Sequence, residues 1–313
     1  MTIYDLKNQI QTHCIPRPLI AVLGNFDGVH IGHQALFRQA NALRQEFPTA
    51  KCAAWTFAKH PLEDSLLCLN TKEERLQKFA ACGMDFAILE DFARVRNFTP
   101  EVFVKEILHE TLHCCAVVCG FNYKFGCGGC GDVETLKKLG EQYGIQIIAV
   151  APVTESGIVV SSTRIRAALA CGDVAQAARC LGQMYTLTAP VVHGREIGHT
   201  IGIPTINQEP PLGKQLTGEG VYATLSTLQD GRSYRSVTNV GAQPTVQGKQ
   251  LCLETHLIHF NGNLYGKTVQ ISFLQRLRAI QSFPSLEVLQ RTIQNDIAVS
   301  LSLHDPTITS KIR

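Results

Sequence analysis

The residues best suited to chemistry stand together in one segment, GNFDGVHIGH, which runs from Gly24 to His33. The segment follows an apolar run that predicts a strand, and it precedes the first predicted helix. Open α/β sheets bind nucleotides at such a junction, with phosphate at the helix N-terminus. Gly24 and Gly28 permit backbone turns that a Cβ atom would block. Because His30 and His33 are three residues apart, they share one face of the first helical turn.

Two imidazoles at a helix N-terminus can stabilise the negative charge that develops on phosphorus during nucleotidyl transfer. The alternative is a pair of surface histidines beside an ordinary turn. The spacing H-x-G-H after a strand and a glycine turn favours the catalytic interpretation, so we predict that both histidines are catalytic. The nucleotide-binding residues expected beside them are Gly24, Phe26, Asp27 and Gly28.

This H-x-G-H segment resembles that of the nucleotidylyltransferase superfamily. Class I aminoacyl-tRNA synthetases share the motif, but we find no loop here that resembles their Lys-Met-Ser-Lys-Ser element. The segment VSSTRIR, from Val160 to Arg166, resembles the I-S-S-T-x-x-R element with which the transferases close over the same nucleotide. The resemblance implies nucleotide contacts for Ser162, Thr163 and Arg166 near the start of a helix.

The elements that must position these residues alternate in type along the first half of the chain. Strands are expected at Leu19–Leu23, Lys51–Phe57, Asp85–Leu89, Ala116–Cys119 and Gln146–Val150. Helices are expected at Ile31–Glu46, Thr71–Cys82, Pro100–Thr111 with Thr99 as N-cap, Asp132–Tyr143, Ser161–Ala170 and Val174–Leu181. Five strands separated by helices predict βαβ units and a Rossmann-like parallel sheet with helices on both faces.

The pattern changes after Gly182, where the apolar runs become rich in Val, Thr and Ile and are separated by turns. Strands are expected at Thr186–His193, Gly220–Leu228, Ser236–Val240, Leu251–Phe260 and Lys267–Leu274, with a final amphipathic helix at Leu286–Leu303. This pattern is typical of a small antiparallel barrel or sandwich. We therefore predict an α/β domain, residues 1–183, followed by a β-barrel domain with a terminal helix, residues 184–313.

Four segments of the second half carry a further signature: HGREIG (193–198), GIPTIN (202–207), NVGAQPT (239–245) and LETHLIHF (253–260). With the first-half motifs, they make essentially the whole chain resemble the bacterial bifunctional riboflavin kinase/FAD synthetase family. The resemblance implies an N-terminal FMN adenylyltransferase domain and a C-terminal riboflavin kinase barrel. It also implies ATP as co-substrate, Mg²⁺ for both reactions, and FMN and FAD as product ligands.

The resemblance assigns roles to individual residues as well. In the barrel it implies that Thr205 and Asn207 hold Mg²⁺ with ATP and that Glu254 is the general base. The nucleotide-binding residues implied there are Gly194, Gly198 and Asn239. The flavin-binding residues implied are Phe57, His60, Asn122, Tyr123, Phe125 and Arg278.

Elementary chemistry is consistent with the barrel roles. Hydroxyl and amide oxygens are hard ligands suited to Mg²⁺, which keeps several waters and takes phosphate oxygens as further ligands. A carboxylate such as that of Glu254 can take the proton from a primary hydroxyl as it attacks phosphorus. Alternation with Leu253 and Thr255 equally fits a solvated residue on the outer face of a strand.

Four positions depart from the family pattern. His199 and Gln243 stand where arginines are usual, Lys59 where a proline is common, and Asn122 where an aspartate is common. Arginine is the best bidentate donor to phosphate, and neither histidine nor glutamine supplies its charge and geometry. These departures leave the reaction class unchanged and bear on nucleotide affinity in the kinase domain.

Composition excludes several other classes of protein. The 313 residues are 45% hydrophobic and 18% charged, which is a globular composition. A net charge of +3 gives little support to a nucleic-acid partner. No apolar run approaches the ~20 residues that span a bilayer, and the N-terminal segment does not resemble a signal peptide. We therefore expect a cytoplasmic monomer or weak homo-oligomer that binds small molecules, with no nucleic-acid or membrane partner.

The twelve cysteines are expected to be reduced in that location. One cluster comprises His113, Cys114, Cys115, Cys119, Cys127 and Cys130, in which the last two have C-x-x-C spacing. A zinc knuckle needs a second such pair, so we expect no structural zinc.

Two glycine-rich segments imitate nucleotide motifs. Gly126–Gly131 matches G-x-G-x-x-G, but it lies beyond a strand end and lacks the acidic partner of a dinucleotide site. We expect a flexible substrate loop there. Gly262–Thr268 has three residues between its glycines where a Walker A loop requires four, so we expect a hairpin turn.

Two other functions stay open on the sequence. One is nucleotidyl transfer to another phosphorylated acceptor, such as phosphopantetheine, although such enzymes end near the H-x-G-H domain and lack a barrel with a PTIN segment. The other is a non-catalytic flavin-binding sensor. The joint presence of both histidines, Thr163, Arg166, Thr205, Asn207 and Glu254 argues against such a loss of catalysis.

Overall fold

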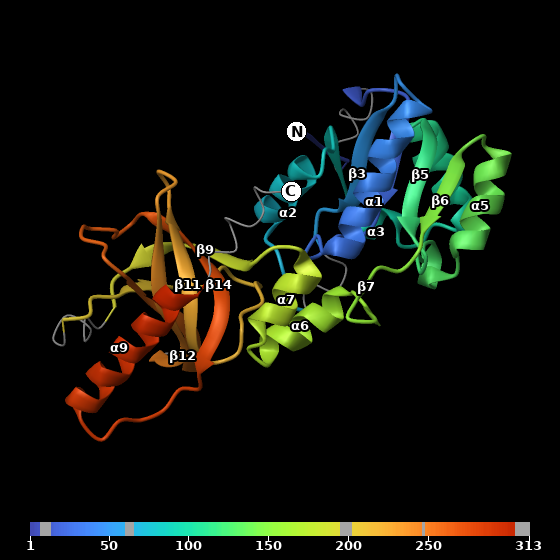
Figure 1. The fold of residues 1–313 in the computed structure, drawn as a ribbon. Helices are drawn as coiled ribbons and strands as arrows, with labels where there is room; N and C mark the ends of the chain where they lie inside the picture. Colours follow the sequence, from blue (N-terminus) through green and yellow to red (C-terminus); the bar gives the residue numbers. More distant parts are fainter. Residues whose placement is uncertain (7–13, 60–65, 195–201, 246–247, 304–313) are drawn as a thin grey trace. The chain divides into compact units, whose positions relative to one another are not determined.

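The first half of the chain builds a parallel sheet with the strand order β1-β4-β3-β2-β5-β6 (Figure 1). Its strands are β1 (Thr2–Asp5), β2 (Leu19–Leu23), β3 (Lys51–Phe57), β4 (Phe86–Glu90), β5 (Cys114–Gly120) and β6 (Gln146–Val150). The computed structural model describes residues 1–6, 14–59, 66–194, 202–245 and 248–303. The five predicted strands are confirmed, and β1 adds a sixth that the sequence did not indicate because it is short and half-exposed.

Both faces of this sheet are buried. Along β2, Leu19, Ala21 and Leu23 join one apolar cluster, while Ile20 and Val22 join the other. Successive strand residues point to opposite faces, so a strand apolar at every position must be covered on both sides. The predicted sheet with helices on both faces is therefore confirmed.

Each face has its own helices. α1 (Ile31–Ala42) and α2 (Lys72–Ala81) bury Phe37 and Phe79 in one cluster. η3 (Phe103–Thr111) and α5 (Val133–Gln142) bury residues such as Ile107 and Leu136 in the other.

Local chemistry explains where these helices begin. Thr71 and Glu74 form a reciprocal capping box at the start of α2, and Asp132 caps α5. Thr99 caps α4 (Pro100–Val102), as predicted. The predicted helix over 100–111 continues as η3 with π-helical turns, and the Thr111 hydroxyl donates to the Glu106 carbonyl at 2.6 Å.

Several short elements were not predicted because they contain too few residues to show a periodic pattern. They are α3 (Phe92–Val95), η4 (Cys127–Gly129) and the hairpin of β7 (Thr154–Glu155) and β8 (Ile158–Val159). The helix predicted over 31–46 is α1 followed by the 3₁₀ turn η2 (Leu43–Gln45). Two further helices, α6 (Ser162–Ala170) and α7 (Val174–Leu181), follow as predicted, and Gly182 ends α7 in the left-handed conformation.

The second half forms a closed barrel with the strand order β10-β13-β12-β11-β14-β9, and all of its pairings are antiparallel. Its strands are β9 (Tyr185–Val192), β10 (Ile206–Gln208), β11 (Gly220–Leu228), β12 (Ser233–Thr245), β13 (Gly248–Leu257) and β14 (Thr268–Arg278). α9 (Leu286–Ser302) follows and lies along the barrel (Figure 1). The predicted barrel with a terminal helix is confirmed, although β10 was too short to predict.

Contacts divide the chain into two compact units, Met1–Ser162 and Thr163–Arg313. α6 and α7 belong to the second unit, where the Gly218 N–H and the Thr217 hydroxyl donate to the Leu169 carbonyl at 2.7 and 3.2 Å. The division near residue 183 was predicted from a change in sequence pattern. That boundary was meant to separate the residues needed for one activity from those needed for the other, and in this sense it stays a prediction.

Candidate functional site

The H-x-G-H loop connects β2 to α1 through an unusual backbone. Phe26, Gly28 and Val29 have φ angles of 53°, 86° and 46°. Such angles are costly for Phe and especially for the β-branched Val, so the surrounding fold must enforce them. Gly24 is required as well, because a Cβ atom there would lie 2.9 Å from the Phe26 ring.

The two predicted catalytic histidines lie face to face at the start of α1. Their ring centroids are 3.6 Å apart with an interplanar angle of 17°. His30 is the N-cap, and its Nδ1 accepts the His33 backbone N–H at 3.3 Å. Because Nδ1 accepts, the proton of a neutral His30 lies on Nε2, which is then a hydrogen-bond donor.

Burial keeps both imidazoles uncharged. It lowers the pKa of His30 from 6.5 to about 4. For His33, burial first and the neighbouring His30 second lower the pKa well below its usual value. The buried Nδ1 of His33 has no hydrogen-bond partner among the described residues. The loop therefore holds two neutral imidazoles in a fixed orientation.

A second layer of polar contacts holds the loop. The Asp27 carboxylate accepts the Leu69 and Asn70 N–H groups at 2.8 and 3.3 Å. Ser162 donates its hydroxyl to the Asp27 carbonyl at 2.8 Å. Asp27 and Ser162, both predicted as nucleotide-binding, thus also shape the loop.

Arg75 also contacts the H-x-G-H loop, and no motif in the sequence predicts this contact. Its buried guanidinium donates to the Asn25 carbonyl at 3.1 Å and to the Phe57 carbonyl at 2.8 Å. It thereby ties the H-x-G-H loop to the end of β3, where the predicted flavin contacts begin. Its position as the fourth residue of an amphipathic helix carried no signal of this role.

Three of the predicted flavin-binding residues lie in one aromatic cluster. Phe57 contacts Trp55, Trp55 contacts Phe103, Phe103 contacts Phe125, and Phe125 stacks on Tyr123, with centroids 5.2 to 5.9 Å apart. Burial raises the pKa of the Tyr123 hydroxyl, which keeps it protonated. Trp55 and Phe103 also belong to this cluster, although their apolar context in the sequence marks them only as core residues.

Four other residues were predicted for the first site: Asn122, His60, Thr163 and Arg166. Asn122 is exposed beside this cluster, and His60 lies outside the described residues. Thr163 and Arg166 lie in the first turns of α6, which belongs to the second unit.

The barrel brings three predicted residues into one row. Asn207 on β10 pairs with Glu254 on β13, and Glu254 pairs with Asn239 on β12. Directly paired residues of antiparallel strands point to the same face of the sheet. The interior positions beside Glu254 are Leu253 and Thr255, so the row lies on the outer face, where Glu254 is half-buried.

The Asn207 side chain packs closely against the backbone of Gly194. A Cβ atom at position 194 would lie 2.0 Å from the Asn207 amide nitrogen, so only glycine permits this contact. Asn207 is itself buried, and Thr205 precedes it by two residues. Gly198 and His199 lie outside the described residues, as do the side chains of 243–250, including Gln243.

Arg278 continues the same row. It pairs with Val221 on β11, which in turn pairs with Asn239. Its guanidinium forms an ion pair with Asp296 of α9, at 2.9 Å from Nη2 to the carboxylate, and lies over the Phe283 ring. The arginine predicted to bind flavin therefore also holds α9 against the barrel.

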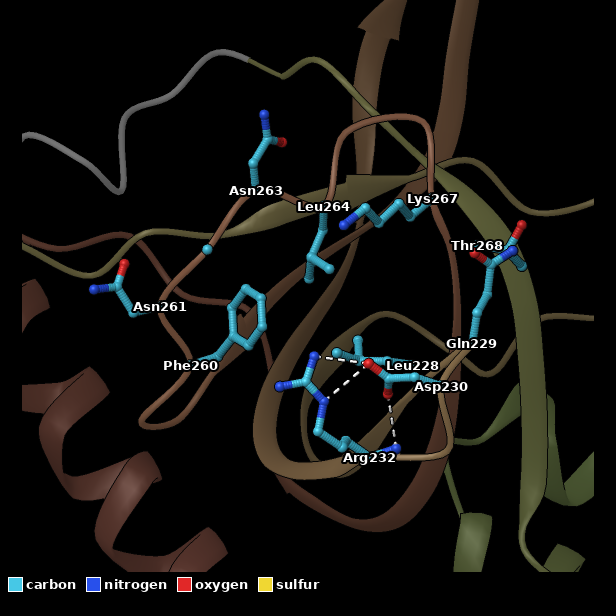
Figure 2. Close-up of a pocket in the computed structure, with 11 residues that line it drawn as sticks. Leu228, Gln229, Asp230, Arg232, Phe260, Asn261, Asn263, Leu264, Lys267 and Thr268 are labelled. Atoms are coloured by element: carbon cyan, nitrogen blue, oxygen red, sulfur yellow. Dashed lines mark hydrogen bonds and ion pairs between the residues drawn. The ribbon is translucent and has the colours of Figure 1, made fainter.

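The connection between β13 and β14 contributes two features. The Tyr265 ring stacks on His193, with centroids 3.9 Å apart, next to Gly194. Beside it, Phe260, Leu264 and Lys267 help to line a pocket of about 340 Å³ (Figure 2). In the pocket Arg232 and Asp230 form an ion pair, drawn with dashed lines in Figure 2, and none of the predicted site residues lines it.

The segment Gly262–Thr268 leads directly into strand β14, so a strand follows it and not the helix of a Walker A loop. The predicted hairpin turn is wrong, because β13 pairs with β10 and β12 while β14 pairs with β11 and β9, and the segment connects two strands that are not neighbours. Tyr265 and the pocket show that this segment still contributes to a surface of the barrel. We expected only a turn there because no local pattern reveals what a loop contacts.

Comparison with known proteins covers both halves. Residues 13–164 match the family model of FAD synthetase, and residues 181–303 match that of riboflavin kinase. The bifunctional riboflavin kinase/FMN adenylyltransferase of Escherichia coli K12 is 33% identical over 303 residues, which are 94% of each chain. The enzyme of the same name from Pseudomonas fluorescens is 34% identical over 297 residues, covering 93% of this chain and 94% of that one.

One solved structure aligns over nearly the full length. It is titled a macrolide-efflux protein from Streptococcus pneumoniae, with a TM-score of 0.88 and 30% identity, and the alignment covers 97% of this chain and 100% of that one. Over the part of our chain that the structure describes, no helix combines the length and hydropathy needed to cross a membrane.

The chain thus joins a parallel sheet that carries a stacked histidine pair to a barrel that carries an Asn–Glu–Asn row. The family models that match the two halves are those of two enzymes that transfer phosphate-containing groups. Together with the relatives, they identify the family. The chain belongs to the bifunctional riboflavin kinase/FMN adenylyltransferase family: with ATP as co-substrate, it converts riboflavin to FMN and FMN to FAD.

Proposed function

We propose that the H-x-G-H loop of the first unit carries out FMN adenylylation. A phosphate oxygen of FMN attacks the α-phosphorus of ATP, forming the new P–O bond while pyrophosphate leaves. His30 donates from Nε2 to an oxygen of the reacting phosphate, and His33, stacked on it, acts beside it. Pre-oriented donors at a helix N-terminus stabilise the charge that grows in the transition state.

The observation that carries this assignment is the stacked, neutral histidine pair at the N-terminus of α1. A surface pair beside an ordinary turn would be solvated and would keep ordinary pKa values. Gly24, Phe26, Asp27, Gly28 and Ser162 shape the nucleotide-binding loop around the pair. Thr163 and Arg166 are proposed to contact the phosphates.

The aromatic cluster is proposed to receive the flavin ring. Phe57 and Tyr123 are partly exposed near the carboxyl ends of β3 and β5, where α/β sheets bind ligands, and the buried Phe125 stacks on Tyr123. Asn122 and His60 are proposed as polar contacts to the same flavin.

In the barrel, we propose that Glu254 takes the proton of the riboflavin 5′-hydroxyl as that oxygen attacks the γ-phosphorus of ATP and ADP leaves. Asn239 flanks the base in the row, and Gly194 and Gly198 are proposed to contact the nucleotide. Arg278 is proposed to contact the flavin from the next strand pair, while its ion pair with Asp296 holds its orientation.

The residues present fit Mg²⁺. Asn207 offers an amide oxygen and Thr205 a hydroxyl, and both are hard oxygen donors. Within the described residues, no cluster of three His, Cys, Asp or Glu side chains could hold a metal unaided. This fits an ion that takes its remaining ligands from phosphate and water. When bound, Mg²⁺ would neutralise charge on the transferred phosphate.

The test is to incubate the full chain with riboflavin, ATP and Mg²⁺ and to separate the products by chromatography. We expect FMN first and FAD after it, with FAD alone lost in a His30→Ala variant. Activity on phosphopantetheine in place of FMN would support the alternative acceptor. Flavin binding without any product would support a sensor. The same preparation tests whether the protein is a monomer or a weak homo-oligomer, as proposed. In line with the proposed cytoplasmic location and small-molecule partners, it should bind neither nucleic acid nor lipid vesicles.

A further inference from the structure

The C-x-x-C segment forms a tight turn beside the proposed flavin site. The Cys130 N–H donates to the Cys127 carbonyl at 3.3 Å. Between them, Gly128 and Gly129 have φ angles of 63° and 68°, which glycine adopts at little cost. Two successive positive φ angles closed by this hydrogen bond describe a type I′ turn.

This turn brings the Cα atoms of Cys127 and Cys130 within the range that a disulfide can span. The first and fourth residues of such a turn have Cα atoms less than about 7 Å apart, and disulfides need about 4.4–6.8 Å. Both cysteines are exposed, so a reagent in solution can reach them. Glycines between them leave no side chain to obstruct closure. Among the described residues, no third ligand makes the pair part of a metal-binding group.

The base of the loop is tightly packed against Phe125. Phe125 and Gly131 exchange two backbone hydrogen bonds, of 3.1 and 2.9 Å. A Cβ atom at Gly131 would lie 2.8 Å from the Phe125 ring. The Cys127 N–H donates to the Phe98 carbonyl at 2.7 Å, which anchors the other end. A shift of Cys130 should therefore move Gly131 and, with it, the Phe125 ring, because Gly131 is hydrogen-bonded to Phe125 and lies close against its ring.

We propose that Cys127 and Cys130 form a reversible dithiol/disulfide site that exchanges with low-molecular-weight disulfides and, when oxidised, weakens FMN binding. One loop thiolate attacks the reagent disulfide, forms a mixed disulfide and releases one reagent thiol. The second loop thiol then attacks the loop sulfur of that mixed disulfide and releases the second reagent thiol. Two electrons pass from the loop to the reagent, and two protons go to the released thiols.

The effect on FMN rests on the proposed flavin site at Phe125, whereas the thiol chemistry does not. Closing the S–S bond draws Cys130 toward Cys127 and moves Gly131 away from its position against Phe125. We expect the KM for FMN to rise about threefold to tenfold, the size that one displaced aromatic rotamer produces. Riboflavin phosphorylation should not change.

The test uses the full chain and oxidised glutathione. After excess reagent is removed, peptide mass mapping should find the 127–130 peptide lighter by two hydrogen atoms, and dithiothreitol should restore both mass and KM. The double variant C127S/C130S should keep the reduced KM under oxidation. Cys171→Ser, which removes another exposed cysteine, should respond like the parent chain.

Each contrary result is specific. A stable glutathione adduct without loop closure would overturn the dithiol site. Loop closure with an unchanged KM for FMN would overturn its coupling to flavin. The Phe125→Ala variant of the reduced protein distinguishes a failed coupling from a wrongly placed flavin site. An unchanged KM for FMN in this variant would show that Phe125 does not contribute to flavin binding.

Discussion

The two proposed active sites are built in opposite ways. In the first unit, the residues from Gly24 to His33 come from one short segment, and a strained loop and one helix start bring them together. In the barrel, Asn207, Asn239 and Glu254 come from three strands, and only strand register makes them neighbours.

This difference teaches where each site is vulnerable. The loop site depends on a buried backbone conformation that its neighbours enforce, so a change at a residue that holds the loop, such as Arg75, should disturb it. The barrel site depends on pairing, and a slip of one residue would turn every side chain of a strand to the other face. The loop site is also the more desolvated, because burial keeps its histidines neutral while Glu254 is only half-buried.

The largest effect is expected from Glu254→Gln. Glutamine keeps the volume and can hydrogen-bond, but it cannot accept the proton of the riboflavin hydroxyl. The kcat of riboflavin phosphorylation should fall ~10²–10⁴-fold, with FAD synthesis from supplied FMN retained. Coupled assays with each flavin substrate measure both. Kinase activity within a few-fold of the parent chain would remove Glu254 from the mechanism.

His30→Ala and His33→Ala should show the reverse pattern. Each removes an imidazole that we propose acts on the reacting phosphate, and the loss of one hydrogen-bond donor there costs about 10²–10³ in kcat. The KM values should change less, because the interaction forms in the transition state. Steady-state FAD formation from FMN measures this, and riboflavin phosphorylation is the control. Equal loss of both activities would break the comparison between two separate sites.

Gly194→Ala tests how tightly the barrel row is packed. The added methyl group would overlap the Asn207 amide, and such overpacking costs about 1–3 kcal/mol. If that cost falls on Asn207, kcat/KM for ATP in the kinase reaction should fall about tenfold to a hundredfold. FAD formation from FMN should be unaffected. An unchanged kinase would show that Asn207 does not need its present position.

The smallest effect concerns pH and the stability of the first unit. An unfolded histidine takes up a proton below pH 6.5, whereas folded His30 does so only near pH 4. The unfolded state therefore binds more protons in this range, and stability falls as the pH is lowered. From pH 6.5 to 5.5 we expect the free energy of unfolding to drop by about 1 kcal/mol.

Urea unfolding of the full chain at several pH values measures this drop. His30→Gln should flatten the pH dependence, since glutamine does not titrate, and the remaining slope would include His33 and His113, whose pKa values folding also lowers. A transition of the first unit that keeps its stability down to pH 5 would contradict the neutral, buried state of the histidines.

Much of the fold could be predicted because its signals are local. Apolar runs located β2, β3 and β6 at their observed bounds, and Thr71, Thr99 and Asp132 cap helices near the predicted starts. The elements that were missed, such as β1 and β10, are too short for a periodic pattern. They exist because a neighbouring strand already offers unpaired backbone groups.

The candidate sites also combine features with a local sequence signal and features that depend on tertiary contacts. The sequence by itself determined the histidine pair, its glycine turn and the order of motifs, because helix geometry makes residues three apart neighbours. Three features become visible only in the folded chain. Asn207, Glu254 and Asn239 form a row, and Arg75 connects the loop to β3 by hydrogen bonds. Burial also lowers the pKa of His30 and so keeps it uncharged. Strand register, long-range hydrogen bonds and desolvation all depend on which distant residues pack together, and no local spacing encodes that.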